Sequence, residues 1–297
     1  MRALLDYHHP QLYESLKILL EQRLGIEVVR PKGRAWYDEG YFNYYDSEEK
    51  TLAFLEQGDI TLARAKELSF DFMFSTIPLS ESGFERFNKK MGNKAKQVVV
   101  LGNVGYVPPA NFPLLTSTAY QPPGSCFFHQ EFHADFAPFE NKRVITSLLS
   151  NPEQYLDYQL WQECQSLLLD FHWREYGHNA RDGFIDGLEA IRQTSFVWHL
   201  KHVGEGYGHV VHAAAAIGRP LIVRKSYFAG MLVEKYLIHG KTCIDLDVCP
   251  GIDYLKHDLR RFVYDLPDMG RTIREIFDAH VHFTQEAEQV KHFLAHL

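Results

Sequence analysis

The stretch that decides the fold of this chain runs from Gly204 to Ile222 and reads GEGYGHVVHAAAAIGRPLI. Its glycines supply flexible backbone just before a run of helix-forming residues. Free N–H groups and the positive end of a helix dipole gather at such a place and favour an anionic ligand. The small side chains of Ala213 to Ala216 let the helix lie close against a sheet. Gly218 suits a left-handed position at the C-terminus of the helix, and Pro220 prevents the helix from continuing. The apolar residues after Pro220 predict a buried strand. The stretch therefore predicts a phosphate-binding turn of an α/β domain.

The same alternation of strand and helix runs through both halves of the chain. In the first half, Arg2 to Tyr7 and Ile26 to Val29 predict strands on either side of a helix over Gln11 to Arg23. In the second half we expect strands over 144–149, 167–173, 196–201, 221–224 and 242–246, with helices over 152–165 and 183–194. The pattern is helical from Asp253 onward. This rhythm predicts an α/β protein with open, mostly parallel sheets.

Length and turn signals predict two domains. A chain of 297 residues is long enough for two domains of about 100–200 residues each. Prolines and glycine make the region before Asn141 rich in turns, so we expect an N-terminal α/β domain over 1–140. A C-terminal α/β domain with terminal helices is then expected over 141–297.

Composition narrows the class of protein. The formal net charge of −7 gives no overall attraction to nucleic acid, and no run of about 18 apolar residues predicts a membrane span. The four cysteines are scattered without a C-x-x-C pair, so a disulfide framework is not expected. The apolar run at the N-terminus is too short for a signal peptide. We expect a cytoplasmic protein that does not insert into a membrane.

The opening stretch resembles the donor motif of two-domain GT-B-fold glycosyltransferases, E-G-F-G-x-P-x-x-E-A-M-A-x-G-x-P-V-I. The residues in register are Glu205, Gly206, Tyr207, Gly208, Ala214, Ala216, Gly218, Pro220 and Ile222. One departure from the motif matters: Ala213 stands where the family carries the second glutamate of E-x7-E, which usually holds the ribose of the donor. The resemblance implies two Rossmann-like domains in GT-B architecture, followed by a C-terminal helical segment.

The resemblance also implies an activity, the transfer of a sugar from a nucleotide-diphosphate sugar to a hydroxyl acceptor. A UDP-sugar is the expected co-substrate, and no metal or other cofactor is required in that family. Glu205 matches the glutamate that contacts the transferred sugar. The other residues expected on the donor side follow strands or begin the helix, and they are Lys201, Gly206, Tyr207, Gly208, His209 and Arg224. The cations among them are placed to neutralise the leaving diphosphate.

The first half supplies candidates for the acceptor side. Ligands of open parallel sheets bind at the carboxyl ends of the strands, which selects His8, His9, Ser75 and Asn103. An inverting transfer needs a carboxylate or a histidine to remove the proton of the acceptor hydroxyl. Glu131, His133 and Asp135 are the candidates, with Glu131 preferred by position. The alternative interpretation of this cluster is a polar loop between domains.

A metal centre and several other enzyme classes are not supported. His129 and His133 are spaced like a helical metal pair, but Gln130 stands where the H-E-x-x-H pattern needs glutamate. The chain carries no P-loop motif and no G-x-S-x-G nucleophile elbow. The glycines at 204–208 do not form the G-x-G-x-x-G motif of nicotinamide dehydrogenases.

Two further hypotheses concern the acceptor and the activity. The segments around 8–16, 23–25 and 30–33 are similar to compact phage-type glycosyltransferases, some of which glycosylate hydroxymethylated pyrimidines such as hydroxymethylcytosine in DNA. The target base would then be flipped into an aromatic pocket, for which the Trp36 to Tyr45 segment is the candidate. The alternative is a GT-B-fold protein that binds a nucleotide sugar without transferring it, which Ala213 favours.

Overall fold

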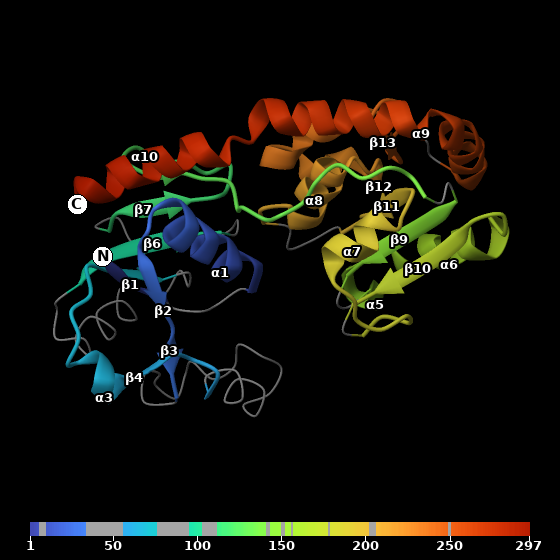
Figure 1. Ribbon diagram of the computed structural model, residues 1–297. Coiled ribbons are helices and arrows are strands. Elements are labelled where there is room, and N and C mark those ends of the chain that lie inside the picture. The colour runs from blue at the N-terminus through green and yellow to red at the C-terminus, as the bar shows by residue number, and fades with distance from the viewer. Residues whose placement is uncertain are drawn as a thin grey trace. The chain divides into compact units, whose positions relative to one another are not determined.

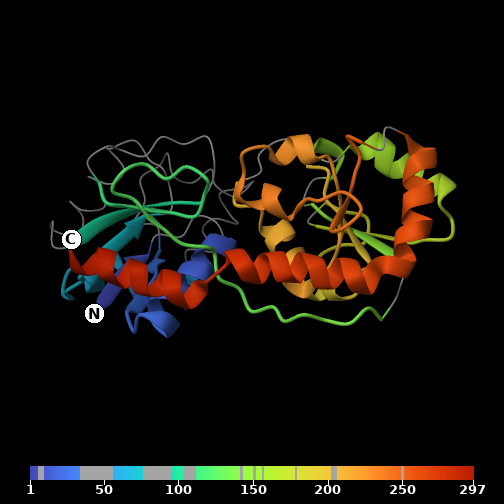
Figure 2. The same cartoon turned by 90° about the horizontal axis from the view of Figure 1, so that it is seen from above.

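The computed structural model describes residues 1–5, 10–33, 56–75, 95–102, 112–140, 143–149, 152–155, 157–177, 179–201, 206–248 and 251–297. The chain forms two compact units (Figures 1 and 2). The first unit comprises Met1–Phe132 and Phe283–Leu297, and the second comprises His133–His282. The aromatic segment at 36–45 lies outside the described residues.

The first unit is built on a six-stranded sheet in the order β2-β1-β5-β6-β7-β8, in which every pair is parallel. The strands are β1 (Arg2–Leu5), β2 (Glu27–Val29), β5 (Phe72–Ser75), β6 (Lys96–Leu101), β7 (Leu114–Thr116) and β8 (Cys126–Phe127). A separate two-stranded parallel sheet pairs β3 (Pro31–Lys32) with β4 (Ile60–Thr61). Among its described residues the helices are α1 (Pro10–Lys17), its π-helical continuation Ile18–Arg23, α3 (Leu62–Ala65) and α10 (Phe283–Ala295).

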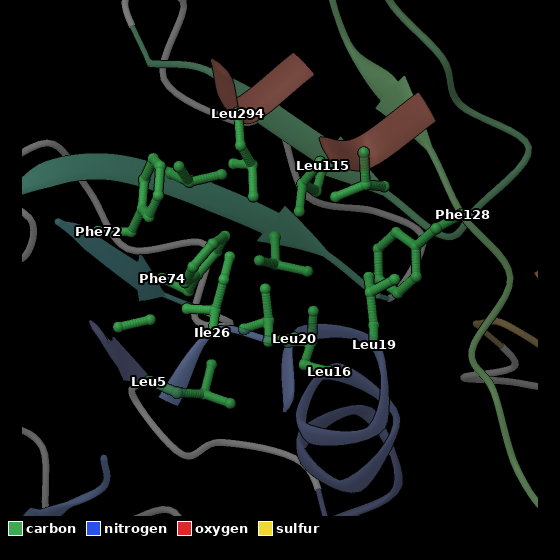
Figure 3. Close-up of a cluster of buried hydrophobic side chains, with 14 of the residues drawn as sticks. Leu5, Leu16, Leu19, Leu20, Ile26, Phe72, Phe74, Leu115, Phe128 and Leu294 are labelled. Atoms are coloured by element: carbon green, nitrogen blue, oxygen red, sulfur yellow. The ribbon is translucent and has the colours of Figure 1, made fainter. Parts of the chain in front are cut away.

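Both faces of this sheet are buried, as parallel sheets require. One face carries Leu5, Phe72, Phe74 and Leu115, against which Leu16, Leu19 and Leu20 pack together with Leu294 of α10 (Figure 3). The neighbouring residues of the same strands, Leu4, Met73 and Val99, belong to a second apolar cluster. Strand residues therefore alternate between two cores, which accounts for the continuous apolar runs in the sequence.

The second unit has a five-stranded, fully parallel sheet in the order β10-β9-β11-β12-β13 (Figure 1). Its strands are β9 (Val144–Leu148), β10 (His172–Tyr176), β11 (Phe196–Trp198), β12 (Leu221–Val223) and β13 (Cys243–Asp245). Its α-helices are α5 (Pro152–Tyr155), α6 (Tyr158–Leu167), α7 (Gly187–Arg192), α8 (His209–Ile217) and α9 (Ile252–His280). Two 3-10 segments, Lys225–Phe228 and Leu232–Tyr236, take the place of the helix between β12 and β13.

The core of the second unit contains three tryptophans in edge contact. Trp161 of α6 lies 4.9 Å from Trp173 and 5.3 Å from Trp198, measured between ring centroids. The first half of α9 covers the same core through Leu255, Leu259 and Phe262. α9 carries Pro267 in its interior, where proline removes a helical hydrogen bond, and the helix bends in Figure 2.

The division of the chain differs from the expected boundary near Asn141. Residues 133–140 belong to the second unit because the buried Arg219 holds them there. Its guanidinium donates to the carbonyl oxygens of Ala137 at 2.7 Å and Pro138 at 2.9 Å, and lies 4.3 Å from the ring of Phe139. Burial lowers the pKa of Arg219 to about 10.

The last helix, α10, belongs to the first unit, whereas the sequence placed it with the second half. Glu286 fixes it there, because its carboxylate accepts from the His129 backbone N–H at 2.7 Å and lies 2.7 Å from His129 Nδ1. Arg23 adds a 3.4 Å hydrogen bond to the Thr284 hydroxyl. The buried charge on an otherwise amphipathic helix is thus explained by a partner 157 residues away.

Candidate active site

The carboxyl edge of the second sheet is where its polar side chains gather. The strand order reverses between β9 and β11, and in open α/β sheets ligands bind at such a switch point. His199 and Lys201 follow β11, Arg224 and Lys225 follow β12, and Asp247 follows β13. The loop that begins α8 lies after β11, so the glycine turn starts at this edge.

The glycine turn has the geometry that the sequence predicts. Gly208 is the N-cap of α8 with φ +80°, a left-handed conformation that favours glycine, and Gly218 ends the helix with φ +81°. A Cβ on Gly208 would lie 2.6 Å from Val233 Cγ1, so the turn also needs glycine for close approach to the Leu232–Tyr236 segment. The first N–H groups of α8 have no partner within the helix and carry the positive end of its dipole.

The rings beside this turn are buried. Tyr207 is 5% exposed, and its ring centroid lies 4.1 Å from that of His212 and 6.0 Å from that of His209. Of the predicted donor-side residues, Gly206 and His209 are half-buried, whereas Tyr207 is buried. The Tyr207 ring thus packs against rings of α8. Glu205 lies outside the described residues.

The two predicted cations have different surroundings. Lys201 is half-buried and comes just after β11. Arg224 extends from the end of β12 toward Asp157 at the start of α6, and the nearest nitrogen–oxygen distance is 3.5 Å. Arg224 also lies 3.9 Å from Asp247 and donates to the Leu246 carbonyl at 3.3 Å.

Asp157 lacks the hydrogen bond that is usual for its position. It is the N-cap of α6, where aspartate normally accepts from backbone N–H groups, but its side chain makes no capping hydrogen bond. Its carboxylate faces Arg224. Asp157, Asp245 and Asp247 are not among the residues that the sequence selects. Asp247 directly follows the strand predicted over 242–246, so the rule for strand ends could have selected it.

Of the acceptor-side candidates, His8, His9 and Asn103 fall outside the described residues. Ser75 is the last residue of β5 and is 3% exposed. It therefore sits at the carboxyl edge of the first sheet, as expected.

Glu131 is held by an ion pair. It is 5% exposed, and Arg23 binds both of its carboxylate oxygens, with nitrogen–oxygen distances of 2.5 and 3.2 Å. This hydrogen bond raises the pKa of Arg23. His133 and Asp135 are exposed. Both of them can be reached from solvent, whereas Glu131 would first have to release Arg23.

The segment around His129 is extended, with no helix over residues 128–140. His129 and His133 therefore do not share a helix face, and His129 Nδ1 is engaged by Glu286. Among the described residues there is no group of three or more His, Cys, Asp or Glu side chains that could hold a metal. Within the same residues, no helix is both long and apolar enough to cross a membrane.

Comparison with known proteins gives matches of structure alone. No protein-family model and no curated protein matches the chain. The structure is similar to Anabaena HepE in complex with UDP and glucose, with a TM-score of 0.62 at 11% identity, covering 100% of this chain and 99% of HepE. It is similar to a glycosyltransferase of Rickettsia africae, with a TM-score of 0.59 at 9% identity over 99% and 98% of the two chains. It is also similar to the lipopolysaccharide outer core galactosyltransferase WaaB, with a TM-score of 0.53 at 11% identity over 100% and 99%.

These similarities span the whole chain at identities too low to show more than the fold. They agree with the two parallel, Rossmann-like sheets and the helical C-terminal segment described above. The expected fold class is therefore confirmed: the chain has the fold of GT-B glycosyltransferases.

Proposed function

We propose that this protein is a glycosyltransferase that moves a sugar from a nucleotide-diphosphate sugar to a hydroxyl acceptor. The observation that carries the proposal is the glycine-capped α8 at the carboxyl edge of the second sheet, where Lys201 follows β11 and Arg224 follows β12. HepE, which has the same fold, has been solved with UDP and with UDP-glucose. These complexes support a UDP-sugar as the donor.

The donor side would act by electrostatic stabilisation. When the anomeric carbon–oxygen bond breaks, negative charge develops on the leaving diphosphate. The N-terminus of α8, with Gly206, Gly208 and His209, would face that charge, and Lys201 and Arg224 would neutralise it. Glu205, which matches the family's first glutamate, would bind hydroxyls of the transferred sugar.

The acceptor side needs a group that removes the hydroxyl proton. We assign this role to Asp135 or His133, because both are exposed and Asp135 lies only two residues from His133 in an extended segment. Glu131, the first preference from the sequence, would instead hold this segment through Arg23. His8, His9, Ser75 and Asn103 remain predicted acceptor-side residues.

The test is donor hydrolysis and transfer with a panel of nucleotide sugars, using Lys201→Met and the exposed Lys241→Met as a matched pair. Removing a cation from the leaving group should lower kcat by about 10²-fold, whereas Lys241→Met should leave it unchanged. The proposal is wrong if the wild-type protein neither hydrolyses nor transfers, and no nucleotide sugar raises its melting temperature.

A second candidate function is binding of a nucleotide sugar without transfer. Ala213 favours it, because this residue is 2% exposed and offers no carboxylate to a ribose. The two functions differ in turnover. A transferase makes many product molecules per protein molecule, whereas a binding protein shifts its melting temperature with UDP-glucose and makes none.

Hydroxymethylated DNA remains a predicted acceptor that the comparisons do not support. The aromatic segment proposed to hold the base lies outside the described residues, and the net charge of −7 opposes binding to DNA. A gel shift with hydroxymethylcytosine-containing duplex at low salt tests this prediction. Absence of a shift under those conditions removes DNA as the acceptor.

A further inference from the structure

A row of aromatic rings connects the glycine turn to the body of the second unit. His212 is fully buried in α8, with its ring centroid 4.1 Å from Tyr207 and 5.2 Å from Tyr236. The Tyr207 and His212 rings are tilted by 51°, and His212 meets Tyr236 edge to face at 74°. Tyr236 continues the row to Phe277 of α9 at 6.4 Å. We call Tyr207, His212 and Tyr236 the aromatic staple.

The staple occupies defined positions at the start of α8. Gly208 is the N-cap, so Tyr207 is the residue before it and His212 is the fourth residue of the helix. Contact between these two positions is the hydrophobic staple, which fixes the angle at which a chain enters a helix. Glycine at the N-cap has no side chain to accept from the first-turn N–H groups and has a flexible backbone. The contact between the Tyr207 and His212 rings therefore fixes the start of α8, as a capping side chain does in other helices.

We propose that His212 is a positioning residue for the donor site. It holds the turn at 206–208 through Tyr207, so that the first N–H groups of α8 point at the diphosphate. This inference rests on the proposed function. Because Ala213 cannot contact the ribose, the turn at 206–208 contributes a larger part of the affinity for the donor. The affinity therefore depends on how rigidly the staple positions this turn.

A purely structural role for His212 would be to fill space in the core. Ile217 provides the control, because it is fully buried at the other end of α8 and does not belong to the staple. Ile217→Ala should destabilise the protein without moving the turn. His212→Phe keeps an aromatic ring at the fourth position, whereas His212→Ala removes it.

The experiment measures UDP binding by calorimetry and melting temperature for these three variants and for Tyr207→Ala, which breaks the same contact from the side of the turn. His212→Ala and Tyr207→Ala should each weaken UDP binding by about tenfold, and His212→Phe by less than about threefold. Ile217→Ala should lower the melting temperature with unchanged affinity. The proposal is overturned if His212→Ala binds UDP as the wild type does, or if affinity follows melting temperature across all variants.

Amide hydrogen exchange separates this inference from the proposed function. His212→Ala should speed exchange of the amides at 207–211 relative to Ile217→Ala, and His212→Phe should restore protection. Equal exchange in the two alanine variants refutes the staple whether or not UDP binds. Failure of the wild type to bind UDP, with the exchange pattern as expected, refutes the donor site while leaving the staple as the device that holds the turn.

Discussion

Replacing Gly208 by alanine tests whether the glycine turn is set by backbone conformation or by close packing. Gly230 is the matched control, because it has nearly the same backbone, with φ +75° against +80°. A Cβ on Gly230 would meet nothing within 4 Å, whereas a Cβ on Gly208 would lie 2.6 and 3.1 Å from the two methyl carbons of Val233. The pair therefore separates the cost of a left-handed alanine from the cost of the contact.

The magnitudes follow from these geometries. A left-handed backbone costs a residue other than glycine about 1–2 kcal/mol, so the free energy of unfolding should fall by this amount in both variants. Carbon atoms pack best at about 3.5–4.0 Å, so the Val233 contact forces a shift that costs about 1–3 kcal/mol more. Gly208→Ala should therefore lower the free energy of unfolding by about 1–3 kcal/mol more than Gly230→Ala. Val233→Ala removes both methyl carbons, so the double variant should recover most of that difference as a coupling energy.

Urea unfolding followed by tryptophan fluorescence is the assay. Trp161, Trp173 and Trp198 pack in the core of the second unit, to which both glycines also belong. The fourth tryptophan, Trp36, lies outside the described residues, so the series is made in a Trp36→Phe background. With a denaturant slope of about 2 kcal/mol per molar urea, a difference of about 2 kcal/mol separates the midpoints by about 1 M. Equal midpoints for the two glycine variants, or no coupling with Val233→Ala, would refute the packing argument.

Three further predictions concern charged groups of the second unit. Arg219→Met should lower the free energy of unfolding by about 3 kcal/mol, because the hydrogen bonds from the charged guanidinium to several carbonyls outweigh the cost of its desolvation. Arg192 is half-exposed and serves as the control: Arg192→Met should lower the free energy of unfolding by under about 0.5 kcal/mol in the same urea assay. Asp157→Asn should tighten UDP binding about threefold by calorimetry, because Arg224 then has one carboxylate fewer to pair with; weaker binding would mean that Asp157 orients Arg224 for the donor. A hydrogen bond from Arg181 holds the pKa of Asp182 below its usual range. Because the pKa of Asp182 is lower in the folded than in the unfolded protein, its ionised carboxylate stabilises the fold at pH values above the unfolded pKa. This stabilisation is lost as the pH falls through the folded pKa. The melting-temperature difference between wild type and Asp182→Asn should therefore shrink from pH 7 to pH 3.

The features that the sequence predicts well are those fixed by neighbouring residues. Gly208 and Gly218 occupy the two ends of α8, and β12 follows where Leu221 to Val223 predicts a strand. Each of these signals acts within a few residues: glycine permits positive φ, and proline stops the helix. The parallel sheets also follow, because their strands are buried on both faces and read as apolar runs.

The region around β10 shows where such reasoning fails. A strand was expected over 167–173, but α6 ends at Leu167 and the strand covers His172–Tyr176. Leu169, part of the apolar run that suggested a strand, is 84% exposed. β10 is an edge strand, and its residues are mostly half-buried or exposed, so its pairing with β9 rather than its composition makes it a strand. The expected single helix over 152–165 is likewise two helices, α5 and α6.

Side-chain partners at the candidate site could not be predicted, because they lie far apart in the chain. Arg23 and Glu131 are 108 residues apart, and Arg224 and Asp157 are 67 apart. The sequence ranks Glu131 as a base by its type and place, and only the fold reveals the guanidinium that binds both of its oxygens. The type of a residue determines which reactions its side chain can take part in, and the groups bonded to that side chain determine whether it is available for them.

Ala213 illustrates how packing and ligand recognition place separate demands on one helix. α8 packs against α7, α9 and the Leu232–Tyr236 segment, and every residue from Val211 to Ile217 is buried. At its end, the glycines at 218 and 270 approach so closely that a Cβ on Gly270 would lie 2.6 Å from the Gly218 carbonyl oxygen. A glutamate at 213 would carry a charge into this packing, which is costly unless a partner receives it. The small residue is therefore explained by the helix contacts themselves, so its presence does not show that transfer has been lost, and the turnover measurement decides between the transferase and the binding protein.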